Sequence, residues 1–600
     1  MIVQETFSKG KCMLKDYFLN EIKIAVNKAI KTGKLGQMQL ADEYSLQIEI
    51  PKNSDFGDFA VNVSSLSRFA KMSPVQIANE ISQLIKKDDF EVNVVAGFIN
   101  FKLSLKLLNT VIKEVLENEE DFARNNIGKG EKVLLEYVSA NPTGPFHIGH
   151  GRWAAMGSAL ANIMKYSGYE LSQEFYINDA GNQINNLGQS LKIRVLQELG
   201  FEVDFPQDEI EVKNYYTGDY LIPIADEFVK ENGEFCSLIT KENFETIDLS
   251  MFSSFAKAKM LELQKELLKK FKTNFDTFYS ELELHEKGEV EKCISELDKK
   301  DMLYTKDGAV WFKSSELGDD QDRVIKKSDG SYTYLTADIA YHYDKLKRGF
   351  EKMINIWGAD HHGYVARMKA AIDALGYNPD SLEVLLGQLV NLVIKGEQVR
   401  MGKRTKMITL EDLINEVGVD ATRFWMIMRS IDTTLDFDIE LAKSNSDENP
   451  VFYVQYAHAR ACSILRNAVS QRYDILREIT QKPACDESDL DKIINNFTED
   501  KLNVIWENDD EKAIDTTKKL ILKLEEYRQI IRAAAANRMP YLVAKYLQEL
   551  AAAFHQFYTF SKVLVEDKDL MLARLSIVKS VKIVLKSALD MIAVSAPEKM

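Results

Sequence analysis

The segment Val133–Arg152 constrains the fold of this chain more than any other. It begins with a run that is apolar except for Glu136, which is typical of a buried strand. Pro142, Gly144 and Pro145 then predict a tight turn, and a helix-competent run follows. Because free backbone N–H groups and the helix dipole both face such a turn, the strand, turn and helix together predict an anion site.

Two histidines, His147 and His150, lie three residues apart in this turn. Their ring N–H groups can follow the charge that moves onto phosphate oxygens in a transition state. Gly149 and Gly151 allow a purine or a ribose to approach the backbone closely. A satisfied turn and half of a metal site are the alternatives. The position between a strand and a helix favours nucleotide binding, and the sequence has no GxxxxGK[ST] motif that would bind the nucleotide instead.

Length and composition set outer limits on the architecture. At 600 residues the chain is too long for one core, so three to four domains are expected. The net charge of −16 argues against a nucleic-acid partner at first, but residues 451–600 hold 22 basic and 21 acidic residues, so charge leaves that question open. No stretch approaches the ~18 apolar residues that cross a bilayer, and no signal peptide is recognisable, so we expect no membrane partner.

The cysteines are too scattered for a structural site. No two of them form a CxxC pair, which argues against a zinc ribbon and a disulfide framework: Cys12, Cys236, Cys293, Cys462 and Cys485. This pattern fits a reducing cytoplasm, and we expect no structural metal.

Hydrophobic periodicity divides the chain into three regions. Residues 1–125 predict a mixed α/β module, with helices through 17–29 and 75–85 and strands at 46–50 and Val94–Phe101. Residues 126–448 alternate strands and helices, the pattern of a Rossmann-type, doubly wound parallel sheet, with a charged helical insertion at about 187–320. Its strand candidates are Val133–Val138, Glu174–Ile177, Met353–Trp357 and Val384–Val393. Residues 449–600 predict an all-helical domain.

Several blocks spread over nearly the whole chain resemble one known family. Ser139–Arg152, which reads SANPTGPFHIGHGR, resembles the HIGH signature of class I aminoacyl-tRNA synthetases in the form found in arginyl-tRNA synthetases. Further blocks of that family match Asn178–Gln183, Gly358–Gly363, Asn449–Arg460 and Ser595–Met600. The resemblance implies a cytoplasmic, monomeric enzyme that uses ATP, with Mg²⁺ accompanying it, to activate L-arginine. The arginine would then be transferred to the terminal adenosine of tRNA(Arg).

The second signature of this class, KMSKS, has only a degenerate match. Arg400-Met401-Gly402-Lys403-Arg404 has arginine for the first lysine and Gly402 for the serine. A glycine-containing loop with several cations can swing onto a triphosphate, although a solvated basic turn has the same composition. With the resemblance, Lys403 joins His147 and His150 as a catalytic candidate. The neighbours of Lys403 join Gly144, Gly149 and Gly151 as ATP-binding candidates.

Two carboxylates are candidates for binding a cationic substrate. Glu136 interrupts a buried strand, so it either forms an internal ion pair or receives a cation. Asp338 follows Tyr334 by four residues and is compatible with a helix cap or a first-turn acid. The resemblance places arginine-binding positions at Glu136, Asn141, Tyr334 and Asp338, and implies that Asp360, His361 and His362 line the ribose or amino-acid edge.

The outer domains are implied to bind tRNA. The N-terminal module resembles the family's tRNA-elbow-binding domain, with Phe98 and Asn100 at its base-contacting positions. The helical domain resembles the anticodon-binding domain, where Tyr453, Tyr456, Tyr558 and the terminal Met600 are candidates for RNA contact. Aromatic residues at helical spacing more commonly form core, so that alternative stays open for the tyrosines.

Two rival functions remain compatible with parts of the sequence. Another class I ligase or a nucleotidyltransferase would share the HxGH loop, but the paired carboxylates and the helical tail speak against it. A non-catalytic RNA-binding paralogue is supported only by the degenerate KMSKS-like loop.

Overall fold

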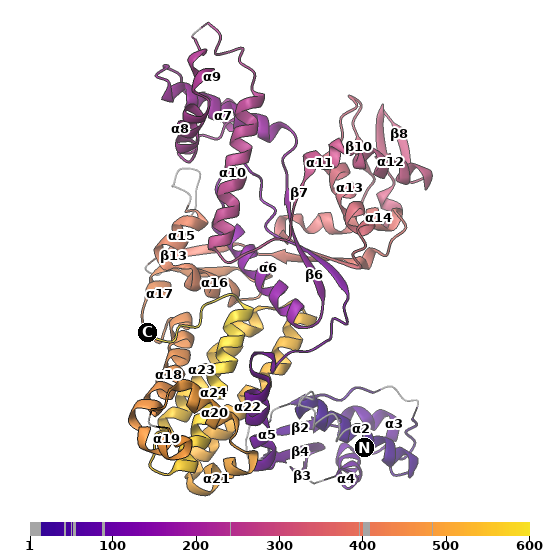
Figure 1. Ribbon diagram of the computed structural model, residues 1–600. Coiled ribbons are helices and arrows are strands. Elements are labelled where there is room, and N and C mark those ends of the chain that lie inside the picture. The colour runs from indigo at the N-terminus through magenta and orange to yellow at the C-terminus, as the bar shows by residue number, and fades with distance from the viewer. Residues whose placement is uncertain are drawn as a thin grey trace.

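The computed structural model describes residues 14–600 apart from 41–43, 50, 52–55, 87–89, 241, 395–396, 400–407 and 483. Figure 1 shows a small N-terminal module and a C-terminal helical bundle side by side below a central α/β region, from which two lobes project. Within these described ranges, no helix is long and apolar enough to span a membrane.

The N-terminal module is an antiparallel sheet covered by helices. Its strand order is β1-β2-β4-β3. The elements are α2 (Leu14–Lys31), β1 (Ile48–Glu49), β2 (Phe59–Asn62), α3 (Ser67–Ala70), α4 (Pro74–Ser82), β3 (Phe90–Val95), β4 (Phe98–Leu103) and α5 (Leu105–Asn118). The expectation of one strand at Val94–Phe101 is wrong. Ala96 and Gly97, with φ of 50° and 87°, form the two-residue turn of a hairpin.

The central region contains the predicted parallel sheet, with strand order β12-β11-β5-β6-β7. Its strands are β5 (Lys132–Glu136), β6 (Glu170–Ile177), β7 (Thr277–Ser280), β11 (Lys352–Gly358) and β12 (Leu382–Gly387). Helix α6 (Ile148–Tyr166) follows β5. Two expectations need correction. The segment 187–320 is not wholly helical, because it contributes edge strand β7. Val384–Val393 is not one strand, because β12 ends at Gly387 and β13 belongs to another sheet.

The lobes lie on either side of β7 in sequence. The first is helical and comprises α7 (Asn182–Glu198), α8 (Leu221–Glu231), α9 (Gly233–Ser237) and α10 (Ser250–Lys270), packed around Phe228 and Phe252. The second combines α11 (Glu281–Glu286), α12 (Glu289–Lys299), β8 (Leu303–Lys306), β9 (Ala309–Phe312), β10 (Arg323–Lys326), α13 (Tyr334–Lys347) and α14 (His362–Ala374). Both lobes reach the central sheet, since α10 leads into β7 and α13 leads into β11 (Figure 1).

A small sheet and short helices join the central region to the C-terminal bundle. They are β13 (Val390–Ile394), β14 (Glu397–Val399), α15 (Leu410–Val417), α16 (Val419–Ile427), β15 (Leu435–Asp438) and α17 (Ile439–Lys443). The bundle is helical as predicted, with α18 (Pro450–Gln471), α19 (Tyr473–Thr480), α20 (Glu487–Asn495), α21 (Val504–Asn508), α22 (Glu511–Ala536), α23 (Tyr541–Phe560) and α24 (Lys568–Met591). The N-terminal module docks on α22, where Arg528 pairs with Glu114 at 2.8 Å.

Candidate active site

Two loops leave the central sheet at the carboxyl ends of the neighbouring strands β5 and β11. Glu136 of β5 is in register with Asn355 of β11 and Glu174 of β6. The chain runs from β5 through β6 to β7 on one side and reaches β11 and β12 on the other. The loops after β5 and β11 therefore meet at the switch point of the sheet, where open α/β sheets bind ligands.

The two histidines of the β5 loop form the start of helix α6. Nδ1 of His147 accepts hydrogen bonds from the backbone N–H groups of Gly149 (3.1 Å) and His150 (3.4 Å). Nδ1 of His150 accepts a hydrogen bond from the backbone N–H of His147 at 3.3 Å. The rings stack with centroids 3.6 Å apart. Because both Nδ1 atoms are acceptors, each neutral ring carries its hydrogen on Nε2.

Burial keeps these rings uncharged. Desolvation holds the pKa of His147 below its ordinary value. Desolvation, together with neighbouring His147, lowers the pKa of His150 to about 3. Near neutral pH the pair therefore offers two Nε2–H donors rather than two cations. Fixed neutral donors suit phosphate oxygens on which charge develops during a reaction.

The glycines around the histidines have protein neighbours of their own. A Cβ atom on Gly149 would lie 2.9 Å from Cε1 of His147, and one on Gly151 would lie 2.5 Å from Cδ1 of Leu410 in α15. A Cβ on Gly144 would lie in ordinary contact, 3.4 Å from the Tyr220 hydroxyl. Side-chain packing around α6 thus already favours glycine at two of these positions, and the approach of a purine or ribose stays a prediction.

The KMSKS-like residues Arg400, Met401, Gly402, Lys403 and Arg404 lie outside the described residues. The segment that follows them is attached to the histidine loop. Thr409 caps α15 and forms a β-bridge with His147, and the backbone N–H of Leu410 donates to the carbonyl of Phe146 at 2.8 Å.

The backbone is strained where β5 ends. Val138 and Ser139 have φ of 69° and 40°. Left-handed conformations cost non-glycine residues about 1–3 kcal/mol each. The turn directs the Ser139 hydroxyl back to Glu136, where it donates to Oε1 at 3.0 Å and accepts from the backbone N–H of Tyr176 at 3.1 Å. Nothing in the apolar run of the sequence predicts this turn.

Glu136 forms the internal ion pair that the sequence left open. Nζ of Lys345, which is fully buried, donates to its Oε2 at 2.5 Å and also lies 3.3 Å from Oδ1 of Asn355. Since Ser139 occupies Oε1, both carboxylate oxygens have protein partners. Lys345 lies 209 residues away in sequence, so only the fold could identify it as the partner.

Asp338 is neither a helix cap nor a first-turn acid. Helix α13 begins after Thr333 at its N-cap, which places Asp338 in the second turn. The hydroxyl of Tyr364 donates a hydrogen bond to Oδ2 of Asp338. The pKa of Asp338 is raised to about 7, chiefly by burial. Glu281 and Glu136 add to this rise, and the hydrogen bond from Tyr364 and the charge of Lys345 oppose it. Among the described residues, no lysine or arginine forms an ion pair with this carboxylate.

Glu281 is a site residue that the sequence did not reveal. It directly follows β7, is 6% exposed, and has its pKa raised by desolvation. Burial is the largest cause of the raised pKa of Tyr176, and the carboxylates of Glu281, Asp338 and Glu136 raise this pKa as well. The three carboxylates therefore lie near the Tyr176 hydroxyl. Glu281 could have been predicted as a site residue because it directly follows a strand of the sheet, but that strand lies in a region expected to be helical.

The remaining predicted substrate residues lie at the open side of the loops. Asn141 is exposed, and its Nδ2 donates to Oε1 of Gln183 at 2.8 Å. Tyr334 is 70% exposed at the start of α13. Asp360, His361 and His362 follow β11 and are all exposed. These side chains are accessible to a ligand, and none of them forms a hydrogen bond or ion pair with Asp338.

The predicted tRNA residues are partly in the core. Asn100 is buried in β4 beside the half-buried Phe98, and its Nδ2 has no hydrogen-bond partner in the described part of the chain. The ring of Tyr453 lies 4.9 Å from that of His555, and Tyr456 lies 5.9 Å from the same ring. Tyr456 is exposed.

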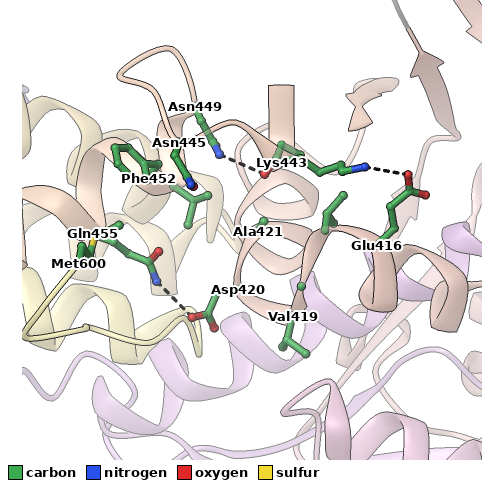
Figure 2. A pocket seen from close by; sticks show the side chains of 14 residues that line it. Glu416, Val419, Asp420, Ala421, Lys443, Asn445, Asn449, Phe452, Gln455 and Met600 are labelled. Carbon is green, nitrogen blue, oxygen red and sulfur yellow. Dashed lines mark hydrogen bonds and ion pairs between the residues drawn. The ribbon is translucent and has the colours of Figure 1, made fainter. Parts of the chain in front are cut away.

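Tyr558 and Met600 lie at the surface of the helical bundle. The hydroxyl of Tyr558, which is exposed, accepts a hydrogen bond from Arg460 at 2.5 Å. Met600 borders a pocket of about 550 Å³ between α15–α17 and α18. Figure 2 shows Met600 beside Gln455, whose Nε2 donates to Oδ2 of Asp420 at 3.1 Å.

Comparison with family models assigns all three regions. Residues 19–103 match the arginyl tRNA synthetase N terminal domain, residues 111–430 match the class I (R) tRNA synthetase catalytic domain, and residues 489–600 match the DALR anticodon binding domain. Two curated relatives are an arginine–tRNA ligase of Anoxybacillus flavithermus, 44% identical, and one of Bacillus subtilis, 43% identical. Each comparison covers 98% of this chain and 99% of the relative.

Solved structures agree with these matches. A Campylobacter jejuni structure described as an arginyl-tRNA synthetase superposes with a TM-score of 0.69 at 34% identity, over 83% of this chain and 100% of that one. The Thermus thermophilus arginyl-tRNA synthetase shares the fold, with a TM-score of 0.70 at 21% identity, over 98% of this chain and 100% of that one. The predicted class of fold and the predicted function are thereby confirmed. The chain belongs to the arginyl-tRNA synthetase family, class I ligases that use ATP to join arginine to its tRNA.

Proposed function

We propose that the side chain of arginine binds among the carboxylates at the carboxyl end of the sheet, with Asp338 as its principal partner. The observation that carries this proposal is that Asp338, Glu281 and Glu136 all act on the Tyr176 hydroxyl, while within the described residues only Glu136 has an ion pair with a lysine or arginine, Lys345. A guanidinium offsets this excess of negative charge, and its planar donors suit two carboxylates. Glu136, held by Lys345, contributes charge more than direct contact.

The outer residues would hold the rest of the amino acid. Asn141 binds its α-amino or carboxylate end, and Tyr334 packs against its side chain, while Asp360, His361 and His362 line the ribose or amino-acid edge. A lysine in this pocket would leave carboxylate acceptors unmatched, and a site built for hydrogen bonds rejects such a substrate strongly.

We propose that activation proceeds by in-line attack of the arginine carboxylate on the α-phosphorus of ATP. The bond between the α-phosphorus and the bridging oxygen breaks, and arginyl-adenylate and pyrophosphate form. His147 and His150 donate Nε2–H groups to the phosphates, and the loop glycines line the nucleotide. Lys403 and its neighbours neutralise the pyrophosphate, supported by the bridge between His147 and Thr409, six residues after Lys403. Mg²⁺ would arrive bound to ATP.

Transfer then completes the reaction, as a hydroxyl of the terminal adenosine attacks the carbonyl carbon of the adenylate and releases AMP. We propose that Phe98 and Asn100 contact tRNA from the N-terminal module. Tyr453, Tyr456, Tyr558 and Met600 would contact it from the helical domain. We place the domain boundaries near residues 125 and 448. We also propose a cytoplasmic monomer, consistent with Cys236, Cys293, Cys462 and Cys485 all being unbridged.

Arginine-dependent exchange of pyrophosphate into ATP, with and without tRNA(Arg), tests the pocket assignment. Lysine matches the charge of arginine but not its planar donors, and citrulline matches its shape but not its charge. We expect exchange with arginine alone, and competition by neither analogue at concentrations near the KM of arginine. Strong competition by citrulline would contradict the carboxylate assignment, because citrulline has no cation to offer Asp338.

A further inference from the structure

Helix α10 carries a buried glutamine that holds the turn before the histidine loop. The side chain of Gln264 is 3% exposed. Its Nε2 donates hydrogen bonds to the carbonyl oxygens of Asn141 at 3.1 Å and Gly144 at 3.0 Å. This places one amide group of the helical lobe across both ends of the Asn141–Gly144 turn, which lies between β5 and α6.

A second side chain of the same lobe supports the turn. The hydroxyl of Tyr220, which precedes α8, donates to the carbonyl of Thr143 at 2.6 Å. Among the described residues, the main-chain groups of the Asn141–Gly144 turn form no backbone–backbone hydrogen bond. Three carbonyl oxygens of the turn, those of Asn141, Thr143 and Gly144, thus accept hydrogen bonds from the side chains of Gln264 and Tyr220.

Two further observations separate Gln264 from an ordinary core residue. Its Oε1 is buried and has no hydrogen-bond partner in the described ranges, an arrangement that costs stability and calls for an explanation. A cavity of about 220 Å³ is bordered by Gln264 and Tyr220 together with Pro145 and Phe146, the two residues that follow the turn.

We propose that Gln264 is a positioning residue for arginine activation. Its amide fixes the turn that carries Asn141 at one end and leads into His147 at the other, and so sets the distance between the amino-acid and phosphate contacts. The inference rests on the proposed roles of Asn141 and His147. A misplacement of about 1 Å at a distance from the reacting atoms can cost about 10²-fold in rate.

The test is Gln264→Met in the full-length protein, which keeps the length of the side chain and removes its donors. We expect kcat of arginine-dependent pyrophosphate exchange to fall about 10- to 100-fold, with tRNA affinity and the thermal midpoint close to those of the parent. Gln197→Met is the matched control, because Gln197 Nε2 donates to the carbonyl of Val203 at 2.9 Å within the same lobe but away from the turn. Equal kcat values for Gln264→Met and the parent would overturn the proposal.

Gln264→Glu adds a pH signature that a general packing role would not produce. A protonated glutamic acid can donate one of the two bonds, whereas the carboxylate donates none and repels both carbonyls. The ratio of variant to parent kcat should therefore rise as pH falls, and the same ratio for Gln264→Met should stay flat. A flat ratio for both variants would count against the proposal.

Tyr220→Phe tests the positioning of the turn if the Gln264 variants fail to fold, because it removes one hydroxyl and keeps the ring. We expect a loss of about fivefold in kcat, the value of one neutral hydrogen bond of about 1 kcal/mol, and an unchanged kcat would overturn the proposal. Asn141→Ala and His147→Ala distinguish an error in the role of Gln264 from an error in the proposed site. If these also leave exchange unchanged, the assigned site is wrong. If only they impair it, Gln264 alone is misassigned.

Discussion

Similar groups lie at the two ends of helix α13, but among the described residues only the carboxylate at its carboxyl end is paired with an arginine. At its carboxyl end, the fully buried Glu174 of β6 is bound by the guanidinium of Arg348, with N–O distances of 2.6 and 2.9 Å, and by the hydroxyl of Tyr341 at 2.7 Å. The guanidinium also lies over the ring of Tyr279. Carboxylate, tyrosine hydroxyl and aromatic face together hold one guanidinium.

At the amino end of α13 the same kinds of group surround Asp338. Tyr364 donates its hydroxyl, Tyr176 and the carboxylate of Glu281 lie close by, and no arginine or lysine of the described chain pairs with Asp338. Burial consequently raises the pKa of Asp338 to about 7. The fold thus contains one protein-internal guanidinium site at Glu174, and we propose that the pocket around Asp338 uses the same kinds of group for the guanidinium of the substrate.

Asp338→Asn should have the largest effect on arginine binding, because it removes the charge and keeps the volume. We expect kcat/KM for arginine in pyrophosphate exchange to fall by about 10²- to 10⁴-fold, since removing one partner of a buried charge pair costs about 3–5 kcal/mol. Asp344→Asn is a control on the same helix, because Asp344 pairs with Nε of Arg348 at 2.9 Å, away from the pocket. Similar losses in both variants would mean that α13 is merely destabilised.

Arg348→Met removes the guanidinium at the carboxyl end of α13, so it should lower stability and leave arginine binding unchanged. It leaves Glu174 buried without its guanidinium, so we expect the free energy of unfolding to fall by about 2–4 kcal/mol. The KM for arginine should stay close to that of the parent at temperatures where the variant is folded. Thermal unfolding and exchange kinetics measured on one preparation test both statements, and a raised KM without loss of stability would contradict the division of roles.

Tyr364→Phe changes the amino end of α13 and should have a smaller effect on the KM for arginine. The hydrogen bond from Tyr364 favours the ionised form of Asp338, so its loss should raise the pKa of Asp338 further above its present value of about 7. We expect the KM for arginine at neutral pH to rise about tenfold, as for a hydrogen bond to a charged group worth about 1.5 kcal/mol. The defect should shrink as the pH is raised and Asp338 ionises. A defect that is the same at every pH would assign Tyr364 another role.

Local signals in the sequence were sufficient to predict the secondary structure that carries the site. Pro142, Gly144 and Pro145 sit between an apolar run and a helical run, so the strand–turn–helix at the nucleotide loop could be predicted without knowledge of the fold. The helical period of the C-terminal region was equally informative. At Val94–Phe101 the apolar run concealed a turn, because Ala96-Gly97 is not one of the dipeptides that mark a two-residue hairpin.

The residues that complete the site depend on contacts that are distant in sequence. Lys345 meets Glu136 only because α13 lies against β5 and β11, and a lysine in a helix gives no sign of full burial. Glu281 reaches Tyr176 because β7 pairs with β6, a register that was not visible in a region of helical composition. The strain at Val138 and Ser139 is likewise fixed by tertiary contacts.

The pH dependence of arginine binding shows whether the Asp338 carboxylate binds the guanidinium of the substrate. Because the pKa of Asp338 is about 7, this carboxyl is mostly protonated below that pH and no longer pairs with a guanidinium, which stays charged throughout. Calorimetric titration of the full-length protein with L-arginine should give a Kd that weakens towards tenfold per pH unit as pH falls below about 7. In Asp338→Asn, Kd should be weak and independent of pH over the same range. A parent Kd that is constant from pH 6 to 8 would contradict the account.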